Sequence, residues 1–233
     1  MDCSKLRSYK FWNKFQSGKW EPSTFKIFDR FCDKDHSYID IGAYIGPTVL
    51  YGCQLARHCF AIEPDPIAFQ ELKNNIELNE HIKSRITLSK YCISHIGTIK
   101  LFTSEENVEN AGGSSSTILD NGYKNFWEVQ TTTLQQFIQD FHITDCNFIK
   151  IDTEGAEFDI IPNALDYLKN QKPTLLIELH PMFVKEFFKN WNIMCKTLSV
   201  YDHMYNADLK EIDENYIHSV NLAKQFHVVW TDL

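Results

Sequence analysis

The sequence predicts an α/β fold in which a mostly parallel central sheet carries helices on both faces. Short apolar runs rich in β-branched residues alternate with longer stretches of helical periodicity. From about residue 38 the order is strand, helix, strand, helix, strand, which favours parallel pairing through crossover helices. Acidic residues directly follow several of these strands, and the carboxyl ends of parallel strands meet at one edge of a sheet.

Length and composition favour one α/β domain with a small appendage. The chain has 233 residues, and we assign residues 1–36 to an aromatic-rich helical segment that packs on a domain formed by residues 37–233. The net charge of −8 and the absence of a long Lys/Arg run argue against nucleic acid as a partner. The sequence contains no run of 18 apolar residues, so it predicts no membrane span. Seven scattered cysteines without a C-x-x-C pattern favour a reducing, cytoplasmic location.

The segment YIDIGAYIG, residues 38–46, predicts a strand, a glycine turn and a following helix. The strand covers 38–42, and the helix covers about 47–56 with a proline in its first turn. This geometry brings backbone close to a nucleotide-like ligand. The pattern is D-x-G-x-x-x-G, which matches neither the dinucleotide fingerprint nor a phosphate-binding P-loop. Asp40 before the loop suits a ligand with a positive group, although an ordinary strand–turn–helix corner is the alternative.

A second acid, Glu63, follows Gly42 by 21 residues and ends the next predicted strand, 58–63. A parallel βαβ unit places such a carboxylate against ribose hydroxyls. A ribose carrier with a cationic amino-acid end is S-adenosylmethionine, which we predict as the ligand. The turn GKWEPST before the first strand places Glu21 where it could contact the amino-acid end. The residues predicted to bind the ligand are Glu21, Asp40, Gly42, Tyr44, Gly46, Glu63, Asp65, Cys92 and Asp152.

The remaining elements are placed by periodicity. Helices are expected from about Ser23, where Ser23 is a good N-cap, over 67–79 and over 134–141, and strands over 85–89, 91–94, 98–102 and 129–133. The end of the third strand, with Tyr91 and Cys92, would provide the apolar slot for adenine. The segment 103–127 is irregular, and its GGSSS stretch at 112–116 is either a surface loop or the lid of an acceptor site.

A second polar cluster follows two later strands. Asp152, Thr153, Glu154 and Glu157 follow the strand 148–151, and the strand that begins at Thr174 ends with Glu178 and His180. The candidates for catalysis are Asp152, Glu154, Glu178 and His180. His180 suits a general base because its pKa can lie near neutrality. Alternatively, Asp152 and Glu178 would hold a divalent cation such as Mg²⁺ or Ca²⁺, and the other histidines show no ligand-like spacing.

Four segments resemble the FkbM-type S-adenosylmethionine-dependent methyltransferases. They are DIGAYIG, AIEPDPIAFQELKNNIELN, FIKIDTEGAEFDII and LLIELHP, in this order, between about residues 36 and 182. The resemblance implies a Rossmann-like class I methyltransferase fold and O-methyl transfer, often to hydroxyls of sugars or polyketide-type products. It implies that Asp40, Gly42 and Gly46 line the methionine end of the donor, Glu63 holds the ribose and Asp152 lies near the sulfonium.

The predicted function is therefore O-methyl transfer from S-adenosylmethionine to a carbohydrate hydroxyl. Three alternatives remain: a methyltransferase of a non-sugar natural product, a non-catalytic module that binds S-adenosylmethionine or a glycan, and a nicotinamide dehydrogenase, which the missing G-x-G-x-x-G disfavours. Beyond residue 181 no motif is evident, and that part of the chain is expected to supply the last strands, about 196–201 and 226–231.

Overall fold

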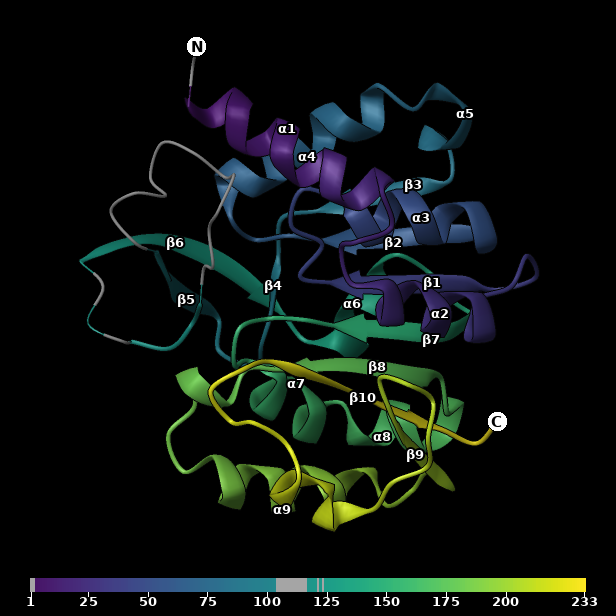
Figure 1. Ribbon diagram of the computed structural model, residues 1–233, viewed down its shortest axis with the longest axis vertical. Helices are drawn as coiled ribbons and strands as arrows, with labels where there is room; N and C mark the ends of the chain where they lie inside the picture. Colours follow the sequence, from purple (N-terminus) through teal and green to yellow (C-terminus); the bar gives the residue numbers. More distant parts are fainter. Residues whose placement is uncertain (1–2, 104–116, 121, 123) are drawn as a thin grey trace.

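The centre of the protein is a seven-stranded sheet with the order β3-β2-β1-β7-β8-β10-β9 (Figure 1). The structure is a computed structural model that describes residues 3–103, 117–120, 122 and 124–233. The five strands from β3 to β8 pair in parallel, and β10 and β9 pair antiparallel. The strands are β1 (Ser37–Ile41), β2 (His58–Ile62), β3 (Ile86–Ser89), β7 (Cys146–Ile151), β8 (Thr174–Leu179), β9 (His203–Asn206) and β10 (Phe226–Thr231). The predicted mostly parallel sheet is confirmed.

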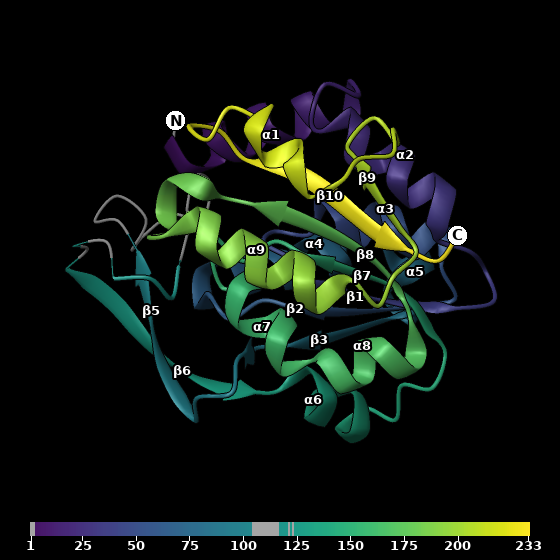
Figure 2. The ribbon, with the colours of Figure 1, turned by 90° about the horizontal axis from the view of Figure 1, so that it is seen from below.

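Helices cover both faces of this sheet. Figure 2 shows α2 and α3 on the side opposite to α6 and α8. One face is packed by α2 (Pro22–Phe31), α3 (Pro47–Leu55), α4 (Pro66–Glu77) and α5 (Glu80–Lys83). The other is packed by α6 (Leu134–Asp140), α7 (Glu157–Asn163), α8 (Leu165–Gln171) and α9 (Phe187–Leu198). The N-terminal helix α1 (Cys3–Gln16) contributes Phe11 and Trp12 to a separate apolar cluster around Ile45.

A smaller sheet lies beside the carboxyl end of the central one (Figure 1). Its strands β4 (Cys92–Ile93), β5 (Thr98–Thr103) and β6 (Asn125–Thr132) have the order β4-β6-β5. The strand expected at 129–133 therefore begins earlier, within the stretch that the sequence marked as irregular. The GGSSS stretch at 112–116, considered as a lid, lies outside the described residues.

Two details of the predicted elements are wrong. Residues 196–198 end α9 rather than begin a strand, because Trp191, Met194 and Leu198 repeat at helical spacing and are all buried. The edge strand β9 follows at His203–Asn206. Ser23 is not an N-cap: α2 begins one residue earlier with Pro22, in the first helical position that proline favours, after Glu21.

Strand alternation places three buried charged side chains of the sheet on one face. Successive side chains of a strand point to opposite faces, so Asp40, Lys150 and Glu178 share the face of α2 and α3 with Tyr38, Phe148 and Leu176. Register sets two cross-strand pairs: Asp40 lies opposite Lys150, and Glu178 lies opposite His227. All of Asp40, Lys150 and Glu178 are buried. The sheet thus brings Asp40 beside Lys150, more than 100 residues later in the chain, and Glu178 beside His227, 49 residues later.

The turn after β1 ties three strand ends together. The amides of Gly42 and Ala43 both donate to the carbonyl of Ile62 at 3.0 Å, and the amide of Asp152 donates to the carbonyl of Ile41 at 3.0 Å. Gly42 has a φ of 82°, and a Cβ atom there would overlap the carbonyl oxygen of Asp152. Only glycine satisfies both the backbone conformation and the close approach.

We expect Gly42→Ala to destabilise the protein by about 2 kcal/mol or more, because left-handed backbone and a main-chain overlap are both imposed. Urea unfolding followed by circular dichroism measures the change. Gly97→Ala is the matched control, since a Cβ at Gly97 meets no atom within 4 Å. Equal stability of the two variants would contradict this account of the turn.

Candidate active site

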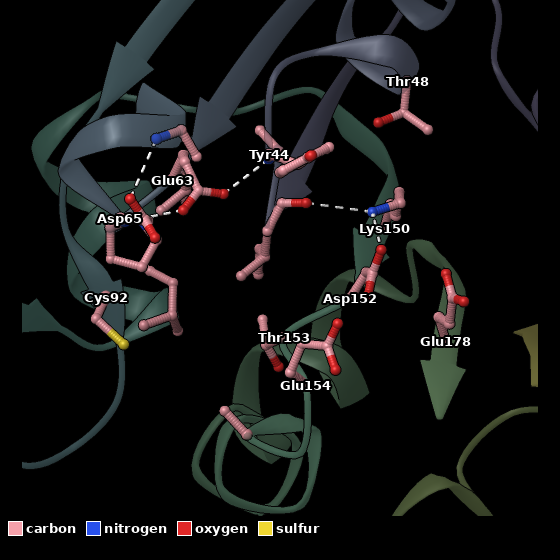
Figure 3. A pocket seen from close by; sticks show the side chains of 18 of the residues that line it. Tyr44, Thr48, Glu63, Asp65, Cys92, Lys150, Asp152, Thr153, Glu154 and Glu178 are labelled. Atoms are coloured by element: carbon pink, nitrogen blue, oxygen red, sulfur yellow. Dashed lines mark hydrogen bonds and ion pairs between the residues drawn. The ribbon is translucent and has the colours of Figure 1, made fainter. Parts of the chain in front are cut away.

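A cavity opens at the carboxyl ends of β1, β2, β7 and β8. Figure 3 shows Glu63 and Asp65 on one side of it and Lys150, Asp152 and Glu178 on the other. Phe11, Trp20 and Tyr44 add aromatic surface, so the N-terminal segment contributes to the wall. Of the predicted site residues, Asp40 and Gly46 do not line the cavity. Asp40 lies beneath it, paired with Lys150, and Gly46 is the N-cap residue that precedes α3, with a φ of 97°.

Glu63 is held rigidly at the end of β2. Its carboxylate accepts the backbone amide of Tyr44 at 2.7 Å and that of Asp65 at 2.8 Å. Burial raises the pKa of Glu63 to about 8, although these amides act in the opposite direction. Each carboxylate oxygen keeps a second lone pair that can accept a ligand hydroxyl.

Asp65 caps a helix beside the cavity, and Cys92 forms part of its apolar wall. Asp65 caps α4 by accepting the amides of Ile67 at 2.8 Å and Ala68 at 3.1 Å, which satisfies the first turn of that helix. Cys92 is buried in β4 and lines the cavity with Ile93 and Leu101. An apolar slot therefore lies next to Glu63, where the sequence predicted the adenine.

Lys150 links the two halves of the cavity. Its ammonium lies 3.1 Å from Asp152, 3.5 Å from Asp40 and 3.4 Å from the carbonyl oxygen of Gly42. Burial alone would lower the pKa of Lys150, but Asp152 and Asp40 raise it. The sequence showed Lys150 only as an interruption of an apolar strand. Its role was missed because the neighbour Asp40 is brought to it by register alone.

His180 faces three carboxylates on the other side of Asp152. Its Nε2 lies 3.7 Å from Glu154, 3.9 Å from Glu178 and 4.0 Å from Asp152. Burial would lower the pKa of His180, but these acids, Asp152 foremost, raise it. The acids around His180 therefore favour its charged form, and that form has no lone pair with which to accept a proton. This environment weakens the prediction that His180 is the base.

Glu178 pairs with His227, at 3.1 Å between Oε2 and Nε2. Burial would raise the pKa of Glu178, but His227 lowers it to about 2. Burial and then Glu178 raise the pKa of Glu21 to about 7. Within the described residues, the His, Cys, Asp and Glu atoms close enough to hold a metal are those of Glu21, Glu178 and His227, so Asp152 is not in that group. His227 was missed because its partner lies 49 residues away.

The fold is that of the class I methyltransferases, and the cavity opens at the carboxyl ends of its central strands. A family model described as the methyltransferase FkbM domain matches residues 40–212. The chain belongs to this family of S-adenosylmethionine-dependent methyltransferases, as the four segments indicated.

Solved structures with a TM-score above 0.5 share this fold. The FkbM methyltransferase of Methylobacillus flagellatus KT is 18% identical in sequence, with a TM-score of 0.51. The match covers 86% of this chain but only 44% of the length of that protein. SMU.1697c of Streptococcus mutans, in complex with SAH, is 12% identical with a TM-score of 0.51 and covers 90% of this chain and 96% of its own. A Clostridium thermocellum protein assigned as an rRNA methylase is 9% identical, with a TM-score of 0.49, over 89% and 93% of the two chains. The search of curated proteins returned no match.

None of the helices in the described residues has the length and apolarity required to cross a bilayer.

The pKa of Glu63 predicts a pH-dependent stability. Its folded pKa of about 8 exceeds the ordinary value of 4.5, so the folded state binds more protons and loses stability as pH rises between these values. Relative to Glu63→Gln, the wild type should lose up to about 1.4 kcal/mol per pH unit in this window. Urea unfolding at pH 5 to 8 measures this change in the free energy of unfolding. Glu128→Gln is the control, because Glu128 is exposed. Parallel curves for wild type and Glu63→Gln would refute this.

Removing the buried ammonium of Lys150 should strongly lower the stability of the folded protein. Lys150→Met leaves Asp40 without its partner, and we expect a loss of about 3–5 kcal/mol. Asp40→Asn combined with Lys150→Met should recover part of it, because the uncompensated charge is gone. A thermodynamic cycle from chemical unfolding measures the coupling. Additive losses would show that the Lys150–Asp40 pair is not the cause.

Proposed function

We propose that the protein transfers the methyl group of S-adenosylmethionine to a hydroxyl of a carbohydrate. The observation that carries the proposal is one cavity with two chemically different sides. One side has Glu63 next to an apolar slot, which suits adenosine. The other has Asp152, Glu154 and His180, which suit a hydroxyl and its proton.

In this proposal the donor lies across the ends of β1 and β2. Glu63 accepts the ribose hydroxyls while its amide contacts keep it in place. Cys92 and Ile93 face the adenine, and the turn Gly42–Tyr44 passes the amino-acid end. Asp152 lies near the sulfonium, where a carboxylate favours the positive charge of the donor. Asp40 acts through Lys150, which fixes the position of Asp152.

The reaction is an in-line displacement. A lone pair of the acceptor oxygen forms the new O–CH₃ bond, the S–CH₃ bond breaks, and its electron pair remains on sulfur in S-adenosylhomocysteine. The hydroxyl proton passes to a carboxylate, for which we propose Asp152, with Glu154 as the alternative. Burial raises the pKa of Asp152 and makes it a better proton acceptor than an ordinary aspartate. Positioning of the two reactants supplies much of the remaining acceleration.

Hydroxyl-rich acceptors are favoured by the polar lining of the acceptor side. Thr153, Glu154 and His180 offer several hydrogen-bonding groups within one wall. The net charge of −8 keeps nucleic acid a disfavoured acceptor. A non-sugar natural product with vicinal hydroxyls presents the same chemistry. A module that binds the donor or a glycan without turnover is the remaining alternative. We also propose a cytoplasmic location.

A labelled-methyl transfer screen tests the function. Purified protein is incubated with methyl-labelled S-adenosylmethionine and with mono- and oligosaccharides, polyphenolic natural products and RNA, and products are read by mass and NMR. We expect label on a carbohydrate oxygen. Label on RNA or on a non-sugar product would replace the acceptor class. Donor binding without transfer to any member would favour the binding module.

Asp152→Asn should reduce turnover at least 100-fold, because the amide cannot accept the hydroxyl proton. The variant keeps the side-chain shape, so far-UV circular dichroism should match the wild type. Asp208→Asn, at an exposed position, is the matched control and should keep full activity. A folded Asp152→Asn protein with wild-type rates would remove Asp152 from the chemistry.

A further inference from the structure

A trio of potential ligand atoms adjoins the acceptor side of the cavity. Glu21 comes from the residue before α2, Glu178 from the end of β8 and His227 from the start of β10. The ligand atoms of the three side chains all lie within 4.8 Å of one another. Glu178 and His227 are opposite partners across two strands, so the sheet itself fixes their spacing.

The nitrogen of His227 has two oxygens within hydrogen-bond distance and a third at 4.0 Å. Its Nε2 lies 3.1 Å from Glu178, 3.3 Å from the hydroxyl of Thr24 and 4.0 Å from Glu21. A protonated ring nitrogen carries one hydrogen and makes one good hydrogen bond. Around a metal ion with bonds of about 2.0–2.2 Å, adjacent ligand atoms lie about 3–4 Å apart. The observed spacings match such a shell with small movements.

The compensating charge near Glu178 comes from imidazoles: Nε2 of His227 lies 3.1 Å from it and Nε2 of His180 lies 3.9 Å from it. A metal ion on Nε2 of His227 would replace the ring proton and supply that positive charge itself. Among the residues that the structure describes, no Lys or Arg nitrogen lies within 4.0 Å of the carboxylate of Glu21 or Glu178. Lys150 is directed to Asp40 and Asp152 instead. Glu178 is only 2% exposed, so its negative charge is poorly solvated. Glu21 and Glu178 both line the cavity, which gives an ion and an acceptor access to them.

We propose that Glu21, Glu178 and His227 form a site for a divalent transition-metal ion such as Mn²⁺ or Zn²⁺. One imidazole and two carboxylates suit these ions better than Ca²⁺. The site differs from the pair Asp152 and Glu178 that the sequence suggested, and it moves Glu21 from the donor half to the acceptor half. The inference rests on the proposed function for its role: the ion would orient two acceptor hydroxyls and acidify one, whose proton passes to Asp152.

Binding of Mn²⁺ to the metal-stripped protein tests the site without any substrate. Titration calorimetry and the loss of the free-Mn²⁺ electron paramagnetic resonance signal should give one site per chain. Glu21→Gln and His227→Gln should each weaken it at least tenfold. The control is His203→Gln, because His203 lies 2.9 Å from Glu211 in an exposed pair outside the cavity. Zn²⁺ is titrated in parallel.

Circular dichroism checks that each variant is folded. If His227→Gln unfolds, Glu21→Gln still tests the site, because Glu21 precedes a helix and is not part of the sheet. Absence of binding for both ions, or wild-type affinity in folded Glu21→Gln, would overturn the site. Methyl transfer that continues fully in EDTA would overturn its role while leaving the methyltransferase function intact. Metal binding without transfer to any acceptor would instead leave the site standing and contradict the proposed function.

Discussion

The arrangement of the cavity depends on the buried ammonium of Lys150. It lies between Asp40 of β1 and Asp152 beyond β7, and it also reaches the carbonyl of Gly42. Two carboxylates and a glycine turn can approach this closely only because a cation lies among them. The same contact fixes the ends of two central strands relative to each other. The site is therefore organised in part by Asp40, which does not line the cavity but holds Lys150 from beneath.

From this centre the two sides of the cavity acquire different chemistry. On the side that we assign to the donor, the acids accept backbone amides: Glu63 accepts the amide of Tyr44, and Asp65 accepts that of Ile67 at the start of α4. On the acceptor side the acids face one another and histidines. His227 keeps the pKa of Glu178 low, whereas burial raises the pKa of Asp152. A positively charged donor, a proton acceptor and a cation site are all consistent with this distribution.

Much of the fold could be predicted from the sequence because its signals are local. The run around Asp40, the glycine turn and the acids that end strands each reflect periodicity or chemistry within a few residues. His227 and Lys150 could not be assigned, because their partners are set by strand register and not by spacing. The strand expected near residue 200 failed for another reason: the apolar residues that end α9 have helical spacing, and a short apolar run does not separate the two structures.

The central claim is that this cavity binds S-adenosylmethionine. Isothermal titration of the purified protein with S-adenosylmethionine, S-adenosylhomocysteine and NAD tests it most directly. We predict saturable binding of both adenosyl compounds at one site per chain, binding weakened at least tenfold by Glu63→Ala, and no binding of NAD. Binding of NAD alone, or unchanged affinity for S-adenosylmethionine in the folded Glu63→Ala variant, would contradict the account.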